Sequence, residues 1–133
     1  MTTPRETFLR LSQGISDGRW DVLADLYAED AVVEQPFAMA PAPSRIEGRA
    51  ALAEHFAAAG KGPVRLRVRD VVVHETRDPE VIVAEFAYDR VLTTTGAAFE
   101  MGNIQVLRVR DGLIVASRDY HDHAALARAL AGA

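Results

Sequence analysis

Apolar side chains recur at helical spacing along the first part of the chain. Phe8, Leu11 and Ile15 are three or four positions apart, as on the buried face of a helix. A Thr-Pro-Arg-Glu sequence at residues 3–6 supplies an N-cap, a proline suited to the first turn and a capping-box glutamate. The Asp-Gly pair at 17–18 is typical of a helix C-terminus. The pattern therefore predicts a helix between these two signals.

Three further elements and one irregular stretch follow. Apolar residues on one face predict a short helix over 20–27, and an apolar run predicts a strand over 31–35 that Pro36 stops. Closely spaced prolines make residues 37–47 an extended, irregular loop. An alanine-rich segment over 49–59 is expected to form the next helix, ended by glycine and proline.

The hydrophobic period changes from about 3.6 to about 2 in the second half of the chain, which predicts strands. The expected strands cover residues 64–75, 81–95, 99–110 and 113–121. The alternation shifts phase near Asp70, which indicates a β-bulge, and Asp111-Gly112 is a hairpin signal. Asp122 caps a short closing helix through Leu130. Helices followed by consecutive hairpin strands predict an α+β fold, in which N-terminal helices and a curved antiparallel β-sheet form a cone with an internal pocket.

Composition restricts the classes of function. The chain has 133 residues, 49% of them hydrophobic and 26% charged, as expected of one globular domain over residues 1–133. It has no cysteine, so disulfides, thiolate metal sites and cysteine nucleophiles are excluded. A net charge of −4 without a basic stripe argues against nucleic-acid binding. No apolar run is long enough to span a membrane and residues 1–6 lack a secretory signal, so we expect a cytoplasmic protein.

Four stretches of the sequence resemble a known superfamily. Residues 26–37 read LYAEDAVVEQPF and are followed by Gly-Arg at 48–49, at the start of a helix. Residues 109–114 read VRDGLI, and residues 117–122 read SRDYHD. In this order they resemble the nuclear transport factor 2-like superfamily, and within it the SnoaL-like polyketide cyclases, the ketosteroid isomerases and the limonene-epoxide hydrolases. The resemblance implies a cystatin-like cone with a pocket, but this fold hosts many unrelated chemistries.

The steroid-isomerase mechanism does not carry over to this chain. In those enzymes a carboxylate base stands just before a Pro-Phe pair, where this chain has Gln35. Their oxyanion hole uses a tyrosine and a protonated aspartate, at positions occupied here by Leu11 and Gln105. All three groups are replaced, so steroid isomerisation by that route is excluded.

The other two groups leave Asp119 as the common candidate. In the epoxide hydrolases, an Asp–Arg–Asp cluster and an asparagine position a water; Asp119 matches one aspartate and Gln35 the asparagine. Phe86 and Tyr88 replace the remaining arginine and aspartate. The resemblance to the SnoaL-like cyclases implies an acid–base carboxylate in a hydrophobic pocket without a cofactor, a role open to Asp119. The His-Asp-His run at 121–123 is not expected to bind a metal, because adjacent strand residues point to opposite faces.

Strand alternation adds neighbours to Asp119. Along the last strand, the residues expected on its face are Leu113, Val115, Ser117 and His121. The residues expected to line the same pocket and bind substrate are Trp20, Gln35, Phe86, Tyr88, Met101, Asn103 and Gln105. A mostly apolar cavity with a few convergent polar groups is the usual form of a small-molecule site.

These candidates also have structural interpretations. Asp119 and His121 suit an acid–base pair, but an exposed ion pair at a strand end has the same spacing. The amides of Gln35, Asn103 and Gln105 either hold water or a substrate carbonyl, or satisfy hydrogen bonds inside the sheet. The sequence leaves both alternatives open.

The opposite face of the predicted sheet is unusually apolar. Val81, Val83, Ile104 and Val106 point there, where a solvated face is normally more polar. We therefore expect a homodimer formed through this outer face.

Three functional hypotheses remain from the sequence. The first is a small cofactor-independent enzyme in which Asp119 and His121 perform acid–base chemistry on a hydrophobic carbonyl- or epoxide-bearing molecule, by cyclisation, isomerisation or hydration. The second is a non-catalytic domain that binds a small molecule, and the third is a dimerisation module whose pocket is filled by its own side chains. In the first two, residues 37–47 are a candidate lid.

Overall fold

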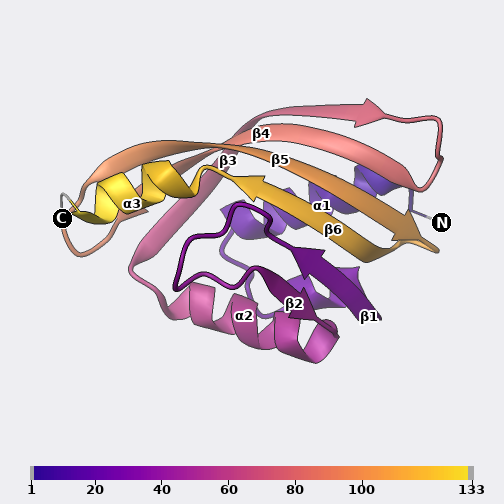
Figure 1. Cartoon of the computed structure of the whole chain (residues 1–133), viewed down its shortest axis with the longest axis horizontal. Helices are drawn as coiled ribbons and strands as arrows, with labels where there is room; N and C mark the ends of the chain where they lie inside the picture. The colour runs from indigo at the N-terminus through magenta and orange to yellow at the C-terminus, as the bar shows by residue number, and fades with distance from the viewer. Residues whose placement is uncertain (1, 132–133) are drawn as a thin grey trace.

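The computed structural model describes residues 2–131, so Met1 and the last two residues of the predicted domain 1–133 lie outside the described residues. Within the described part, three α-helices and one 3₁₀ turn accompany six strands (Figure 1). The helices are α1 (Pro4–Ser16), α2 (Arg49–Lys61) and α3 (His123–Ala131), and the 3₁₀ turn η1 is Leu23–Leu26. The strands are β1 (Tyr27–Glu34), β2 (Arg45–Glu47), β3 (Val64–Glu75), β4 (Val81–Leu92), β5 (Ala98–Arg110) and β6 (Leu113–His121).

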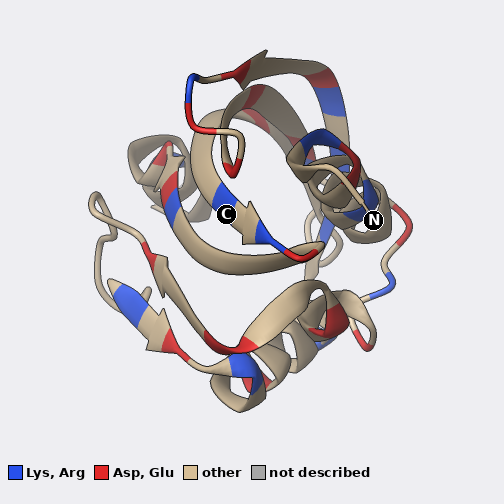
Figure 2. Ribbon diagram, turned by 90° about the vertical axis from the view of Figure 1, so that its right-hand side faces the viewer, with Lys and Arg blue, Asp and Glu red and all other residues tan. Residues whose placement is uncertain are grey.

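The strands form one curved sheet in the order β2-β1-β6-β5-β4-β3. The strands β3, β4, β5 and β6 pair antiparallel, each with the next one along the chain. Figure 2 shows the curl of the sheet end-on. Helix α1 packs across β3, β4 and β5, while α2 packs against η1, β1 and β2. This arrangement confirms the predicted α+β class, with the helices gathered around the concave side of the sheet.

The predicted sheet differs from the observed one in pairing. β1 runs parallel to β6, with Val33 opposite Ser117, so the sheet is mixed and the prediction of a purely antiparallel sheet is wrong. The second difference is β2, which lies inside the predicted irregular loop 37–47 and pairs antiparallel with β1. Hairpin signals report only strands adjacent in sequence, whereas β1 and β6 meet from opposite ends of the chain.

Two observed strands begin or end at other residues than predicted, because of turns next to them. β1 begins at Tyr27, four residues before the predicted strand, because the second helix shortens to the single turn η1. β4 ends at Leu92 rather than residue 95, because the amides of Thr95 and Gly96 turn back to the carbonyl of Leu92.

Two register shifts in the antiparallel part of the sheet affect which side chains face the interior. The predicted one is confirmed at Asp70, which has a φ of 57° where the β3–β4 register shifts. The second was not predicted: Val109 of β5 pairs with Ile114, whereas Arg108 pairs with Ala116. β6 thus has one extra residue between Ile114 and Ala116, which reverses the alternation of inward and outward side chains. Ile114 is therefore buried, while Leu113 and Val115 are not. The expectation that Leu113 and Val115 share the face of Asp119 is therefore wrong.

The core lies between α1 and the concave face of the sheet. Its largest fully buried side chains include Phe8, Leu11, Met101, Leu107 and Ile114. The helix pattern predicted for α1 is confirmed, because the apolar positions of that pattern are the buried ones. In the described residues, no helix is both long and apolar enough to span a membrane.

The outer face of the sheet carries exposed apolar side chains. Val72 and Ile104 are 49% and 41% exposed, and Glu85 lies between them in register. Val83 and Val106 are partly buried on the same face. Pairing of two such faces in a homodimer stays a prediction.

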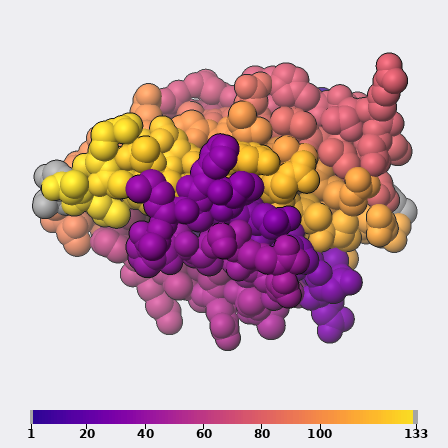
Figure 3. All heavy atoms as spheres, viewed as in Figure 1, coloured from indigo at the N-terminus to yellow at the C-terminus, as the bar shows by residue number. Residues whose placement is uncertain are grey.

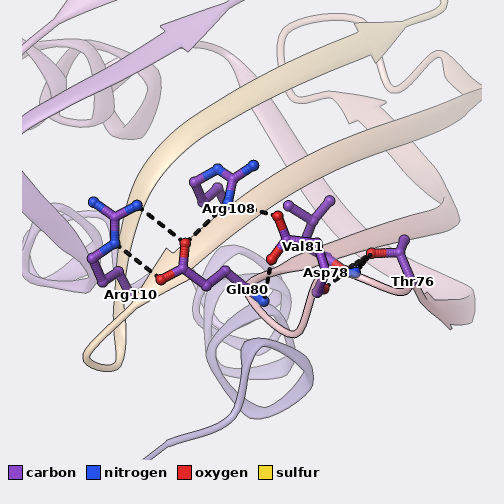
Figure 4. Close-up of polar contacts among 6 residues, drawn as sticks. All are labelled: Thr76, Asp78, Glu80, Val81, Arg108 and Arg110. Atoms are coloured by element: carbon purple, nitrogen blue, oxygen red, sulfur yellow. Dashed lines mark hydrogen bonds and ion pairs between the residues drawn. The ribbon is translucent and has the colours of Figure 1, made fainter.

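Charged side chains near the β3–β4 turn form a separate ion-pair cluster, which we call the Glu80 cluster (Asp78, Glu80, Arg108 and Arg110). Figure 4 shows the Glu80 carboxylate between the two guanidinium groups, at 2.9 Å from Arg108 and 3.0–3.1 Å from Arg110. Arg108 also donates to Asp78 at 2.9 Å. Every charge in this cluster has an opposite partner.

Candidate active site

A cavity of about 310 Å³ lies between the helices and the concave face of the sheet. Most of its wall is apolar, contributed by α1, α2, β1 and β3, and includes Leu11, Ile15, Val33, Leu52, Phe56 and Leu66. The polar side chains in the wall are Tyr27, Gln35, His55, Tyr88, Arg90, Asp119, His121 and His123. This combination has the form of a small-molecule site.

Asp119 is a buried carboxyl group in the wall of this cavity. β6 carries it on its inward face, where the residue is 8% exposed. The hydroxyl of Ser117 donates a hydrogen bond to Oδ1 of Asp119. Burial raises the pKa of Asp119 to about 7, although the hydrogen bond from Ser117 acts in the opposite direction. At neutral pH both the acid and the carboxylate are therefore populated.

His121 lies next to Asp119, as the strand alternation predicts. Its Nε2 is 3.9 Å from Oδ2 of Asp119, and its Nδ1 is 2.7 Å from Oδ1 of Asn103. The amide nitrogen of Asn103 donates to the carbonyl of Met101 at 3.0 Å, which fixes the amide orientation and leaves Oδ1 as an acceptor for the ring. Nδ1 of His121 therefore carries the hydrogen, and the electron pair on Nε2 is directed to the Asp119 side.

Burial keeps this imidazole neutral. The pKa of His121 is lowered to about 4, first by burial and then by the nearby His123, Arg90 and His55. A neutral imidazole with a free electron pair and a carboxyl group that titrates near neutrality thus stand side by side. Such a pair can take up, hold and return one proton.

Two tyrosines face Asp119 across the cavity wall. Tyr27 and Tyr88 are both buried, at 3% and 4% exposure. Burial raises the pKa of each phenol, and the charge of Asp119 raises both further. Both hydroxyls therefore remain protonated at neutral pH and can donate to a substrate oxygen.

Gln35 forms hydrogen bonds with the segment that leads into β2. Its backbone amide donates to the carbonyl of Ser44 at 2.8 Å, and its side-chain amide donates to the carbonyl of Pro43 at 3.0 Å. Pro43 lines the cavity, and Figure 3 shows the segment between β1 and β2 lying against β6 and α3. The ring of Phe37 also packs on Tyr120 of β6, at 5.3 Å between centroids. Gln35 is therefore occupied in closing the loop, which is the structural interpretation of this residue.

The other residues expected in the pocket divide into two groups. Trp20, Tyr88 and Met101 line the cavity with Gln35, Asp119 and His121. Phe86, Asn103 and Gln105 are buried but do not line it, so the expectation that they line the same pocket is wrong, while their contact with a substrate stays a prediction. Phe86 packs between the rings of Phe8 and Tyr88, at 5.3 Å from each, and Asn103 acts through His121.

Four polar residues of the cavity wall are not among the predicted site residues: Tyr27, His55, Arg90 and His123. Arg90 lies two positions after Tyr88 on β4 and so shares its inward face; this parity was a usable signal. His123 begins α3 and lines the cavity from the other side. His55 is exposed at the edge of the cavity. Among the described residues, no group of three or more His, Cys, Asp or Glu side chains is arranged to hold a metal ion.

Known proteins are similar to this chain in sequence and in fold. A family model described as a SnoaL-like domain matches residues 8–117. A PhzA/B-like protein of Pseudomonas aeruginosa, itself uncharacterized, is 38% identical over 98 residues, which cover 72% of this chain and 67% of that protein. A Bacillus subtilis protein provisionally named an isomerase has a crystal structure with a TM-score of 0.88 at 29% identity, over 96% of this chain and 92% of that one.

A further solved structure supports the fold alone. It is a protein of Xanthomonas campestris provisionally named a polyketide cyclase, with a TM-score of 0.77 at 23% identity over 91% of each chain. Together these neighbours confirm the predicted cone fold.

Proposed function

The chain belongs to the SnoaL-like domain family, and from that membership and the cavity around Asp119 we propose that it is a small enzyme that moves protons on a hydrophobic substrate. The substrate bears a carbonyl or an epoxide, and the reaction is a cyclisation, isomerisation or hydration that needs no cofactor. The observation that carries the proposal is a buried carboxyl group, with a pKa of about 7, beside the free electron pair of a neutral imidazole.

The proton balance of such a reaction needs only groups of this chain. With a carbonyl substrate, the carboxylate of Asp119 takes a proton from the carbon next to the carbonyl and becomes a carboxylic acid. The negative charge that develops on the substrate oxygen is stabilised by hydrogen bonds from the phenols of Tyr27 or Tyr88. Asp119 then returns the proton to another atom of the same molecule, which restores the carboxylate.

His121 is a second proton acceptor beside this carboxyl group. Its Nε2 lies 3.9 Å from Oδ2 of Asp119, so a closer approach of the two side chains is needed before it accepts a hydrogen bond from the protonated acid. Asn103 keeps that nitrogen free of hydrogen. For an epoxide, Asp119 instead takes a proton from a water molecule whose oxygen attacks a ring carbon and breaks its C–O bond; Asp119 then gives that proton to the opened oxygen, which restores the carboxylate. Proton transfer by one positioned group contributes roughly 10²–10⁴-fold to a rate, so orientation in the cavity supplies the rest.

The names of the structural neighbours are consistent with this class of reaction. The Bacillus subtilis neighbour is provisionally named an isomerase, and the Xanthomonas campestris neighbour a polyketide cyclase. Both names describe reactions that rearrange one molecule, as the proton balance above requires. The steroid-isomerase route remains excluded, because Leu11, Gln35 and Gln105 cannot supply its catalytic groups.

Deuterium exchange tests the proposal directly. Indanone and indene oxide are incubated with the protein in D₂O, and proton NMR follows exchange next to the carbonyl and opening of the epoxide. We expect the natural protein to accelerate at least one of these reactions, and Asp119→Asn to lose roughly 10²-fold or more of that acceleration while remaining folded.

The matched control removes a carboxylate outside the cavity. Asp89→Asn changes the partner of Arg69 on the outer face and should leave the rate unchanged. If Asp119→Asn exchanges protons as fast as the natural protein, Asp119 is not the proton-transfer group. Binding of these probes without any acceleration would favour the alternative, a non-catalytic binding domain.

A further inference from the structure

Arg90 is a cation in the cavity wall that has no anionic partner among residues 2–131. It makes no hydrogen bond or ion pair with any residue between 2 and 131, and its Nε is fully buried without an acceptor. The only favourable contact of its charge in this range is the ring of Tyr88, whose centroid is 5.3 Å from the guanidinium carbon. A buried guanidinium without an acceptor loses hydration that the protein does not replace.

The other arginines show that this is unusual for the chain. Four arginines are partly buried: Arg49, Arg69, Arg90 and Arg108. Arg69 and Arg108 donate to carboxylates, and Arg49 donates to the carbonyl of Tyr27 at 2.8 Å. Of these four, only Arg90 donates to no residue between 2 and 131, and it is the one that lines the cavity.

A second nitrogen atom in the same cavity also lacks a partner. Nε2 of His123 is buried, and no residue between 2 and 131 forms a hydrogen bond with it. His123 and Arg90 are close enough that Arg90 contributes to lowering the pKa of His123. Two nitrogen atoms without a partner among these residues, one on β4 and one on α3, therefore border one cavity.

We propose that the cavity binds a hydrophobic molecule carrying a carboxylate, and that Arg90 and His123 hold that carboxylate. A guanidinium presents two parallel N–H donors that match the two oxygens of a carboxylate, and the buried charge favours an anion over a neutral group. His123 adds a further donor in the tautomer that carries hydrogen on Nε2. The apolar wall that includes Trp20, Ile15 and Leu66 receives the hydrocarbon part of the ligand.

This inference names the substrate class of the proposed enzyme and so rests on the same cavity, but not on its chemistry. Asp119 is not the partner of Arg90, because none of its oxygens lies within 4.0 Å of the guanidinium nitrogens. The carboxylate site and the proton-transfer site are thus separate parts of one cavity. A ligand that spans them places its anionic end at Arg90 and its reacting atoms near Asp119.

Trp20 offers a binding measurement that does not depend on turnover. It is the single tryptophan of the chain and lines the cavity, so its fluorescence reports on occupancy. The probes are adamantane carboxylate and adamantane carboxamide, which share one hydrocarbon body and differ in charge. We expect the carboxylate to bind roughly tenfold or more tightly than the carboxamide, the effect typical of a charged hydrogen bond.

Substitution of Arg90 should remove this preference and nothing else. In Arg90→Met we expect both probes to bind with the weak affinity of the carboxamide, and in Arg90→Lys part of the preference should remain. Arg67→Met removes an exposed arginine of β3 with the same change in charge and should preserve the full preference. The lysine variant keeps the test valid if the methionine variant does not fold.

Several outcomes would overturn the inference. They are equal binding of the two probes to the natural protein, equal weakening of both probes in Arg90→Met, or no saturable response to the carboxylate. Asp119→Asn separates this proposal from the enzymatic one, because it should retain the preference for the carboxylate even where turnover is lost. If Asp119→Asn stays active and the preference also persists, the enzyme proposal fails while the carboxylate site stands.

Discussion

Asp119 and Glu80 are two carboxyl groups of one sheet with opposite environments. Glu80 lies at the end of the sheet, where Arg110 and Arg108 donate to it and lower its pKa to about 2. Asp119 lies in the cavity, where burial raises its pKa to about 7 and only Ser117 donates to it. The same chemical group is thus held ionised in one place and poised between its two forms in the other.

The difference shows where this protein satisfies its polar groups and where it does not. In the Glu80 cluster every charge has a partner. Among the described residues, the buried side-chain atoms that lack a partner are Nε of Arg90, Oε1 of Gln105 and Nε2 of His123. Arg90 and His123 line the cavity, and Gln105 is buried on β5 opposite Asp119, which lines it. Unsatisfied groups destabilise a fold, so their concentration in one place is expected of a site that a ligand completes.

The largest expected effect follows from removing the buried carboxyl group. Below about pH 4 both the folded and the unfolded chain hold the Asp119 proton, so ionisation contributes nothing. Between about pH 4 and pH 7 the unfolded chain loses the proton and the folded chain keeps it, so stability falls as the pH rises. Asp119→Asn should therefore raise the free energy of unfolding at pH 8, by up to about 4 kcal/mol.

Urea denaturation at several pH values measures this gain. The stabilisation by Asp119→Asn should shrink steadily from pH 8 to pH 4, while the loss of turnover persists at every pH. Asp89→Asn, which changes an outer-face carboxylate, provides the matched control. A variant that is less stable than the natural protein at pH 8 would mean that the carboxylate is well compensated, and the contrast with Glu80 would disappear.

A smaller effect is expected from the single hydrogen bond that Asp119 receives. Ser117 stabilises the charged form, so Ser117→Ala should move the titration of Asp119 to higher pH by roughly one pH unit. Carbon-13 NMR of the Asp119 carboxyl group measures the midpoint. Ser117→Thr keeps a hydroxyl and should leave the midpoint near its natural value; a midpoint that moves to lower pH in Ser117→Ala would contradict the assigned role.

Much of the fold could be predicted because caps, bulges and tight turns are determined by residues that are adjacent in the sequence. The α1 cap, the bulge at Asp70 and the Asp111-Gly112 turn depend on a few adjacent residues, and the structure has all three. The parallel β1–β6 pair and the short strand β2 depend on segments far apart in the chain. No local pattern records such pairing, so these features required the structure.

The candidate site divides in the same way. Strand parity placed Asp119 beside His121, and the two side chains are adjacent. The same parity places Arg90 on the inward face of β4. That its guanidinium has no hydrogen-bond partner among the described residues could not be predicted from the sequence. Asn103 could be assigned to the inward face, but its role in fixing the His121 tautomer depends on the orientation of one amide.

The smallest expected effect lies at the other end of the comparison, in Glu80→Gln. The pKa of Glu80 is lowered in the folded chain, so its ionisation stabilises the fold above about pH 4.5, and this contribution is lost as the pH falls toward 2. Because the cluster lies at the surface, its ion pairs are screened, and we expect the melting temperature to fall by only about 1–3 °C at pH 7. Thermal denaturation should show this decrease at low salt, a smaller one at high salt and none near pH 2. The sign of the pH dependence is thus opposite to that of Asp119→Asn. A loss of stability in Glu80→Gln at pH 7 as large as the gain in Asp119→Asn at pH 8 would mean that the Glu80 cluster contributes much of the stability of the fold. Ion pairs and hydrogen bonds, rather than burial, would then dominate the contribution of both carboxyl groups to stability.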